Sequence, residues 1–494
     1  MSEDLSSPQT WRGRFWLAHD PQDEQRGVLT YDPKDGVSLA LVGGFAEHAL
    51  THTATGTVTV MPARARRFPV IHGRVGSTPF TLLDCQVMSS KRSWSEDAPH
   101  EQVVHARQLL AGVLLSDPGA EVFSEFTIEL ENLTNLDHQG DVMVHTNLEP
   151  ELPMGVRWTV AVDPVDPIEV MVDDLTFELG RSYIRPDGDM RRSGLGSSLF
   201  VTSYLTIRAQ TPKSITQWAD TEKQMQDLLT LAMDRPCAVL NATLTPSDDL
   251  LNDENAAAQG NVTLFTLHIT DADPDAAAVE ERKAFFTLAI DGLDFQSLIP
   301  RWISINSRFK TTCDLILGLR YVGGGYLQNQ LITAVAAAEA MHTAMRLDPP
   351  MSNSEFKRLK KLALAAVPAD RQQWLSDKVG SNKHSLVDQL KQLAAIPDQG
   401  VVHRLVPNVD AWAEATKKER NPVAHGGNMS ADADLLIAIT KVTEAVVVLN
   451  LLHLLEIPTE RLVFATVDNP TFSLAARAAR KQWPLENRQL APPQ

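Results

Sequence analysis

The spacing of apolar and polar positions along the chain changes once, near residue 270. Before that point, short segments alternate between apolar and polar residues. In 125–130 (EFTIEL), for example, this alternation places the apolar side chains on one face of a half-buried strand. Helical spacing interrupts the region at 213–233. The pattern predicts strands at 27–31, 37–41, 55–60, 123–130, 156–162, 168–172, 199–207 and 262–270.

From about residue 276 the apolar positions recur every three or four residues, which is typical of helices. The longest predicted helix begins at Ser430, whose hydroxyl can cap it. Polar residues such as Lys441 and Glu444 interrupt its apolar middle, so we expect a buried bundle helix that can also face a second subunit, and no membrane span. The predicted helices are 276–291, 296–319, 325–347, 354–366, 370–379, 385–395, 401–418, 430–456 and 472–483.

The change of period divides the chain into two domains. With 494 residues the chain is too long for one compact core. We therefore expect an α+β protein, with a β-rich N-terminal domain at 1–290 followed by an all-α helical bundle at 291–494.

Composition and charge narrow the class of protein. The chain is 43% hydrophobic and 22% charged, begins with an acidic, polar segment and holds three widely spaced cysteines, so we expect a folded cytoplasmic protein without a secretory signal. The net charge of -17 argues against a protein that coats nucleic acid. That charge is uneven: residues 301–494 hold 23 Lys+Arg and 18 Asp+Glu, a net of +5, which leaves 22 and 44 in residues 1–300, a net of -22.

Most familiar catalytic motifs are missing from the sequence. There is no GxxxxGK[ST] phosphate loop, no HExxH, no GxSxG and no paired CxxC, so we assign no metal and no cofactor. The glycine clusters at 194–196 and 323–325 lack the rest of a phosphate-binding fingerprint and are more typical of turns.

One polar cluster stands out in the helical half, at 417–427 (KKERNPVAHGG). Lys417, Lys418 and Arg420 precede His425 by a few residues, next to two glycines that end a helix. An arginine can clamp a phosphodiester through two parallel hydrogen bonds, and a neutral imidazole can accept the proton of a ribose 2'-hydroxyl. Asn421 could orient either group.

The spacing of Arg420 and His425 is not specific by itself. The same arginine-to-histidine spacing occurs at Arg14 and Arg67. Helix positions five apart lie about 140° from one another, so Arg420 and His425 share a site only if Pro422 distorts the helix or if two subunits pool their residues. The alternative is that Arg420 and His425 interact with the end of their own helix.

The segment 420–425 (RNPVAH), set between helices, resembles the Arg-Asn-x-x-x-His signature of the HEPN superfamily. A long β-rich region before such a domain is similar to the Apea-type anti-phage defence proteins. In the first half this similarity is diffuse, and rests on 11–16 (WRGRFW), 27–29 (GVL) and 39–45 (LALVGGF).

The resemblance implies a metal-independent endoribonuclease whose active site forms where two HEPN domains meet, and hence a homodimer. His425 would act as general base or acid, Arg420 would stabilise the charged phosphate, and Asn421 matches the polar position after the arginine. The product would carry a 2',3'-cyclic phosphate. Glu339 is a carboxylate on an otherwise apolar helix and could orient Arg420 or His425; a structural or solvent-facing role is the alternative.

Together, these expectations describe an anti-phage effector that cuts RNA, such as tRNA, after a phage-derived trigger acts on the N-terminal domain. A rival from another class is a dimeric scaffold that binds RNA or another ligand without cleaving it. Replacement of Arg420 or His425 separates the two, because only a nuclease should lose its activity.

Overall fold

The chain forms two compact units in the computed structural model. Residues 1–279 and 287–300 make up the first unit, and residues 280–286 and 301–494 make up the second. The expected boundary between residues 290 and 291 falls inside the stretch where the chain alternates between the units. The structure describes residues 5–45, 50–52, 58–60, 67–91, 100–137, 142–148, 151, 156–191, 194–267, 278–322, 324–425 and 432–484.

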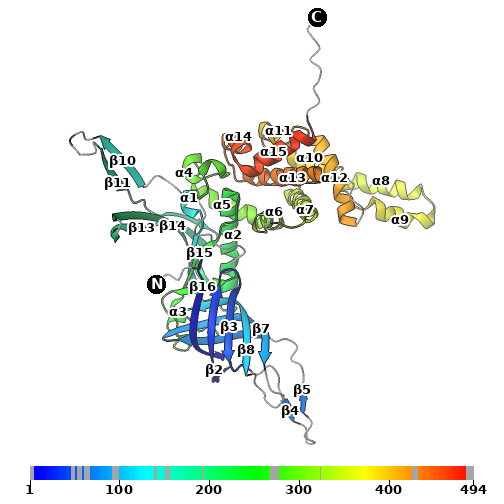
Figure 1. Ribbon diagram of the computed structural model, residues 1–494. Helices are drawn as coiled ribbons and strands as arrows, with labels where there is room; N and C mark the ends of the chain where they lie inside the picture. Colours follow the sequence, from blue (N-terminus) through cyan, green and yellow to red (C-terminus); the bar gives the residue numbers. More distant parts are fainter. Residues whose placement is uncertain are drawn as a thin grey trace. The chain divides into compact units, whose positions relative to one another are not determined.

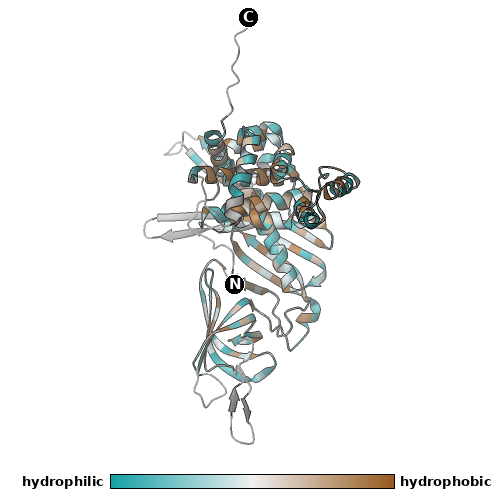
Figure 2. Ribbon diagram, turned by 90° about the vertical axis from the view of Figure 1, so that its right-hand side faces the viewer, coloured by the Kyte–Doolittle hydropathy of each residue, from teal (hydrophilic) through white to brown (hydrophobic). Residues whose placement is uncertain are grey.

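Six antiparallel strands of the first unit close into a barrel, because β7 pairs with both β6 and β8. Apolar residues alternate with polar ones along these strands, as the patches of colour in Figure 2 show, and the apolar set fills the interior. The barrel order is β8-β3-β2-β1-β6-β7, with β1 (Gln9–Leu17), β2 (Asp20–Asp32), β3 (Gly36–Val42), β6 (Arg67–Val75), β7 (Thr78–Lys91) and β8 (Glu101–Ala111).

The two other arginine-to-histidine spacings lie in the barrel, where Arg14 and His72 make structural contacts. Arg14 forms an ion pair with Glu24 across β1 and β2, at 3.1 Å. His72, five residues after Arg67, is buried beside the carbonyl oxygen of Leu115 at 3.2 Å, and burial lowers the pKa of its imidazole. Neither pair has the helical setting of 420–425.

The sheet continues beyond the barrel through β8, which also pairs with β16. Helix α2 (Ile215–Met233) packs on this open part. Ser214 and Gln217 cap it reciprocally, and the buried Trp218 donates its indole N–H to the Phe123 carbonyl at 3.2 Å. The open order is β12-β13-β14-β9-β15-β16, with β9 (Phe123–Leu130), β12 (Ile168–Val172), β13 (Leu175–Arg191), β14 (Gly194–Lys213), β15 (Val239–Pro246) and β16 (Val262–Thr266).

The first unit confirms a β-rich N-terminal region. The helix expected at 213–233 is present as α2, and the strands expected at 123–130, 156–162 and 168–172 are β9, β11 and β12. The expected strand at 262–270 ends at Thr266, and 55–57 lie outside the described residues. The sequence pattern did not predict strands β1, β4, β6, β7, β8, β10, β13 and β15. The short elements of this unit are β4 (Leu50–His52), β5 (Val58–Val60), α1 (Leu133–Asp137), β10 (Val142–Leu148), β11 (Val156–Val162), α3 (Asp248–Leu251) and α4 (Leu288–Asp291).

The second unit is all-helical, as expected. Its central helix α13 packs against α7 and α15, and most of its residues are buried. Figure 1 shows α8 and α9 projecting from the bundle as a hairpin. Its elements are η1 (Glu281–Lys283), the second half of α5 (Phe295–Arg308), α6 (Lys310–Tyr321), α7 (Leu327–Met345), α8 (Asn353–Ala365), α9 (Ala369–Val379), α10 (Leu386–Ala395), α11 (Gln399–Leu405), α12 (Val409–His425), α13 (Ala433–Leu454), α14 (Thr459–Asp468) and α15 (Pro470–Gln482).

Helix α13 is long and apolar enough by composition to cross a membrane, but 83% of its most apolar window is buried inside the bundle. This burial is what a core helix requires. Asp432 caps the helix by accepting from the Asp434 N–H, whereas Ser430, the expected cap, lies outside the described residues.

Three predicted helices differ from the structure. The helix at 276–291 is wrong, because the buried Phe285 and Phe286 lie in a non-helical segment between η1 and α4. The helix at 401–418 is two helices, since Pro407 cannot donate the hydrogen bond that would continue α11. The helix at 296–319 breaks at Phe309, a buried residue that helical periodicity alone does not mark as a break.

Candidate functional site

Arg420 lies near the end of α12, at the margin of the buried face of that helix. Trp412, Thr416 and Glu419 point into the bundle at helical spacing, and the Trp412 indole donates to Thr443 Oγ1 on α13 at 3.3 Å. This packing fixes the rotation of α12 about its axis, so the next residue, Arg420, lies half-buried at the edge of the core.

Glu339 occupies the matching margin of α7. Its neighbours Ala337, Ala338 and Met341 are buried, so the carboxylate stands at the border between core and solvent. Glu339 Oε2 lies 3.4 Å from Arg420 Nη2, and the two side chains are 37% and 32% exposed. An ion pair this exposed contributes little to stability, so its main effect is to hold the guanidinium in one orientation.

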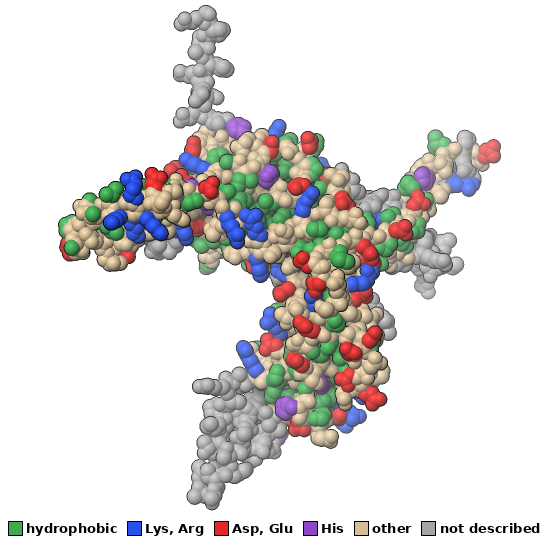
Figure 3. Space-filling view, turned by 180° about the vertical axis from the view of Figure 1, so that it is seen from behind, with side chains coloured by type: hydrophobic (Ala, Val, Ile, Leu, Met, Phe, Trp, Pro, Cys, Tyr) green, Lys and Arg blue, Asp and Glu red, His purple; other side chains and the backbone are tan. Residues whose placement is uncertain are grey.

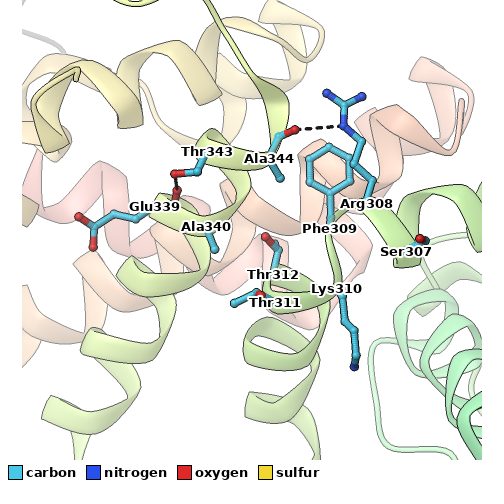
Figure 4. Close-up of a pocket in the computed structure, with 10 residues that line it drawn as sticks. All are labelled: Ser307, Arg308, Phe309, Lys310, Thr311, Thr312, Glu339, Ala340, Thr343 and Ala344. Carbon is cyan, nitrogen blue, oxygen red and sulfur yellow. Dashed lines mark hydrogen bonds between the residues drawn. The ribbon is translucent and has the colours of Figure 1, made fainter. Parts of the chain in front are cut away.

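A pocket of about 500 Å³ adjoins this ion pair. Figure 4 shows Glu339 on one side of it and the junction of α5 and α6 on the other. Arg308 donates to the carbonyl oxygens of Ala344 and Met345, both at 3.0 Å, and so caps the end of α7. The pocket is lined by Ser307, Arg308, Phe309, Lys310, Thr311, Thr312, Glu339, Ala340, Thr343 and Ala344.

The pocket offers polar groups of two kinds. Arg308 and Lys310 supply positive charge, although Lys310 is already paired with Asp314 at 2.9 Å. Hydroxyl groups of threonines lie between these cations and the Glu339 carboxylate, as Figure 4 shows for Thr312. Such a lining suits a ligand with both a phosphate and hydroxyl groups, as a nucleotide has.

The structure places the remaining predicted site residues as follows. Asn421 and His425 belong to the last turns of α12, but their side chains lie outside the described residues. Lys417 and Lys418 are exposed on the same helix, and neither lines the pocket. Because α12 runs through Pro422 as one helix, positions 420 and 425 lie about 140° apart around its axis.

Sequence reasoning missed the cations at the junction of α5 and α6. Arg308 and Lys310 lay inside a helix predicted to be continuous at 296–319, and no motif marked them. The usable signal is the polar run at 308–312 (RFKTT), in which cations and hydroxyls stand together in an otherwise amphipathic segment.

No group of three His, Cys, Asp or Glu side chains in the described part of the chain could hold a metal ion. All three cysteines are free and buried. Burial raises the pKa of the Cys85 thiol well above its ordinary value and that of Cys237 to about 12, so neither thiol is a ready nucleophile.

Two family models match this chain. The model described as ApeA N-terminal domain 1 matches residues 10–302, more than half of the chain, and the model described as Apea-like HEPN matches residues 332–461. Arg420 and Glu339 lie within the second match, whereas Arg308 and Lys310 lie between the two. Neither the curated proteins nor the solved structures that were searched gave a match. The chain thus belongs to the ApeA N-terminal domain 1 family and carries an Apea-like HEPN domain behind it.

Proposed function

We propose that this protein is a metal-independent endoribonuclease that acts as an effector of anti-phage defence. Its HEPN domain implies a ribonuclease, and the ApeA and HEPN families together imply defence against phage. The observation that carries the proposal is the Arg420–Glu339 pair, which joins α12 to α7 beside a pocket whose lining includes Arg308 and Lys310.

The proposed reaction is an attack of a ribose 2'-hydroxyl on the neighbouring phosphorus. His425 takes the proton from the 2'-oxygen, the new P–O bond forms, and the bond to the 5'-oxygen of the next nucleotide breaks as that oxygen gains a proton. The products are a 2',3'-cyclic phosphate and a 5'-hydroxyl. Arg420 stabilises the extra negative charge on the phosphoryl oxygens, and Asn421 orients the phosphate or the imidazole.

Glu339 is the positioning residue in this proposal. Its carboxylate holds the Arg420 guanidinium in one orientation beside the pocket, where Arg308, Lys310 and the threonine hydroxyls can receive the nucleotide next to the scissile bond. The pocket volume of about 500 Å³ falls within the usual range for small-ligand sites, which accommodates one nucleotide.

A homodimer supports this chemistry better than a monomer. The positions of Arg420 and His425, about 140° apart on α12, do not favour a shared site on one helix. Two HEPN domains meeting across a twofold axis can pair Arg420 of one copy with His425 of the other. The proposal further includes a cytoplasmic location, an abundant RNA such as tRNA as substrate, and a phage-derived trigger that acts through the N-terminal unit.

The test is RNA cleavage by the purified full-length protein in excess EDTA. We expect wild-type protein to release 2',3'-cyclic phosphate ends and His425→Ala to cleave about 10²- to 10⁴-fold more slowly, the usual contribution of a general acid or base. His403→Ala, which removes an exposed imidazole on α11, is the matched control and should cleave like wild type.

If the wild type and both variants are inactive in the tube, the same three proteins should be compared for growth arrest in phage-infected cells, where a trigger is present. If wild type and His425→Ala protect the cells equally against phage, the nuclease proposal would be overturned, and the dimeric binding scaffold would be favoured.

A further inference from the structure

The helical hairpin of α8 and α9 is the most basic projection of the described chain. We define the arm as residues 352–383, which carry seven Lys or Arg and three Asp or Glu, a net charge of +4 in a protein of net charge -17. Figure 3 shows these cations along the projecting hairpin. The arm lies inside the span that the HEPN model matches.

The bundle does not need the arm for its core. No residue of α8 or α9 is buried, so neither helix contributes to the interior of the second unit. The arm nevertheless has a defined base: the His384 imidazole lies 2.9 Å from the Asp348 carbonyl, and Asn382 donates to the Met351 carbonyl at 2.6 Å. A fixed hairpin without a role in packing is typical of a contact surface.

Three cations of α8 have no role within the arm. Lys357, Arg358 and Lys361 are exposed, and none of them forms an ion pair with a carboxylate in the described part of the chain. Lys357 and Lys361 stand one turn apart, where like charges repel. Lys360 differs, because its ammonium donates to the Ser376 and Gly380 carbonyls at 3.1 and 3.4 Å and so caps α9.

Two of these three cations lie at a shallow hollow. Lys357 and Lys361 line it together with Lys360 and with Gln372 of α9, and its volume is about 410 Å³. Positive charge that the fold leaves uncompensated attracts a polyanion, and each phosphate that it neutralises releases a counterion. An amide beside these cations adds a donor for a phosphate or ribose oxygen.

The arm leaves the bundle at the end that carries the candidate active site. Glu339 lies six residues before the end of α7 at Met345, about 9 Å along the helix axis, and the arm begins directly afterwards. In Figure 1 the arm projects from the side of the bundle where α7 and α12 lie.

We propose that the arm is an RNA-binding clamp that holds the substrate backbone through Lys357, Arg358 and Lys361 while the scissile phosphate lies at Arg420. This inference rests on the proposed ribonuclease function, and it names the surface that binds the rest of the RNA. Contacts of this kind read the phosphate backbone and not the base sequence.

The test uses full-length protein carrying His425→Ala, so that bound RNA is not cleaved, and a fluorescein-labelled RNA stem-loop as probe. The arm variant combines Lys357→Gln, Arg358→Gln and Lys361→Gln and spares Lys360, which the hairpin needs for its fold. A matched control combines Arg477→Gln, Arg480→Gln and Lys481→Gln on α15, which removes the same charge elsewhere on the bundle.

We expect the arm variant to bind the probe about 10- to 100-fold more weakly at ~0.1 M salt. The slope of log Kd against log salt concentration should fall by about 2, since each of the three phosphate contacts contributes ~0.7 to that slope. The control should keep the affinity and slope of the parent. Equal losses in both variants would mean a diffuse charge effect and would overturn the clamp.

Cleavage separates this proposal from the proposed function. With His425 restored, the arm variant should raise KM and leave kcat nearly unchanged, because it weakens binding away from the reacting atoms. If wild-type protein cleaves RNA and the arm variant binds and cleaves equally well, only the clamp would be overturned. If RNA binding depends on the arm but the wild type never cleaves, only the nuclease proposal would be overturned. Unchanged RNA binding together with a changed oligomeric state would assign the arm to protein contacts.

Discussion

Glu339 and Arg420 are 81 positions apart in the chain, and their contact joins α7 to α12 through side chains. The carboxylate and the guanidinium are both about one-third exposed, so the pair stabilises the fold only weakly. The pair matters for the proposed reaction because it holds the Arg420 guanidinium in one orientation.

We predict that Glu339→Gln lowers kcat for RNA cleavage about tenfold with little change in KM, because the amide keeps the shape of the side chain and loses the charge that orients Arg420. Single-turnover kinetics in EDTA measure this split. The double variant Glu339→Gln with Arg420→Lys should lose less transition-state stabilisation than the sum of the losses in the two single variants, since both changes act on one interaction. Fully additive losses would contradict a positioning role.

The sequence contained part of this site. Arg420, Asn421 and His425 were found through a short motif in one helix, and Glu339 through a carboxylate on an apolar stripe. Arg308 and Lys310 could not be found in this way, because they meet Glu339 only after the chain turns at Phe309 and α6 packs against α7. That turn depends on burial of Phe309, which is a property of the folded bundle.

At the scale of single elements, α2 carries an ionisable group inside the first unit. Glu222 is buried on that helix, its Oε2 atom has no hydrogen-bond partner among the described residues, and burial raises the pKa of its carboxyl group to about 7. A carboxyl whose pKa is raised on folding stays protonated in the native state at mildly acidic pH.

We predict that the free energy of unfolding of the first unit decreases by about 3 kcal/mol as pH rises from about 4.5 to about 7, and then levels off. The unfolded chain releases the Glu222 proton near pH 4.5, while the native state holds it up to about pH 7, so the stabilisation is complete below this window and lost across it.

Urea unfolding of wild type and Glu222→Gln over that range tests the prediction. The glutamine variant should lose this part of the pH dependence, whereas Asp220→Asn, which changes an exposed carboxylate on the same helix, should keep it. Parallel pH profiles for all three proteins would exclude Glu222 as the cause.

Sequence patterns predicted elements best where burial is one-sided. Strands β9 and β12 and helix α2 were found because one face of each is apolar. Strands β6 and β7 were missed because consecutive residues such as Val70, Ile71 and His72 are all buried, so the alternation disappears inside the closed barrel.

For the whole molecule, the proposed dimer makes a prediction about mixed proteins. Arg420→Ala and His425→Ala should each be inactive alone. If one active site takes Arg420 from one copy and His425 from the other, dissociation and reassociation of an equal mixture should restore about one quarter of wild-type activity, because half the dimers are mixed and each has one intact site of two.

Size-exclusion chromatography with light scattering establishes that the mixed dimers form, and cleavage of the same RNA substrate measures the recovered activity. A mixture that forms dimers and stays inactive would place both residues in the site of a single copy.

The short segment Glu280–Phe286 also bears on how such a protein can evolve. Phe285 packs against Phe472 with ring centroids 4.6 Å apart, and Arg461 donates to the Phe285 and Ala284 carbonyls at 3.0 and 2.6 Å, although the chain then returns to the first unit until Pro300. The chain thus passes between the two units three times between Val279 and Arg301. A single recombination point in the gene cannot separate them cleanly: a crossover after Pro300 would leave Phe472 and Arg461 of a transplanted helical unit without their partners. Exchange of N-terminal units among proteins of this build should therefore carry the whole stretch from residue 280 along with the helical half, as one inherited block.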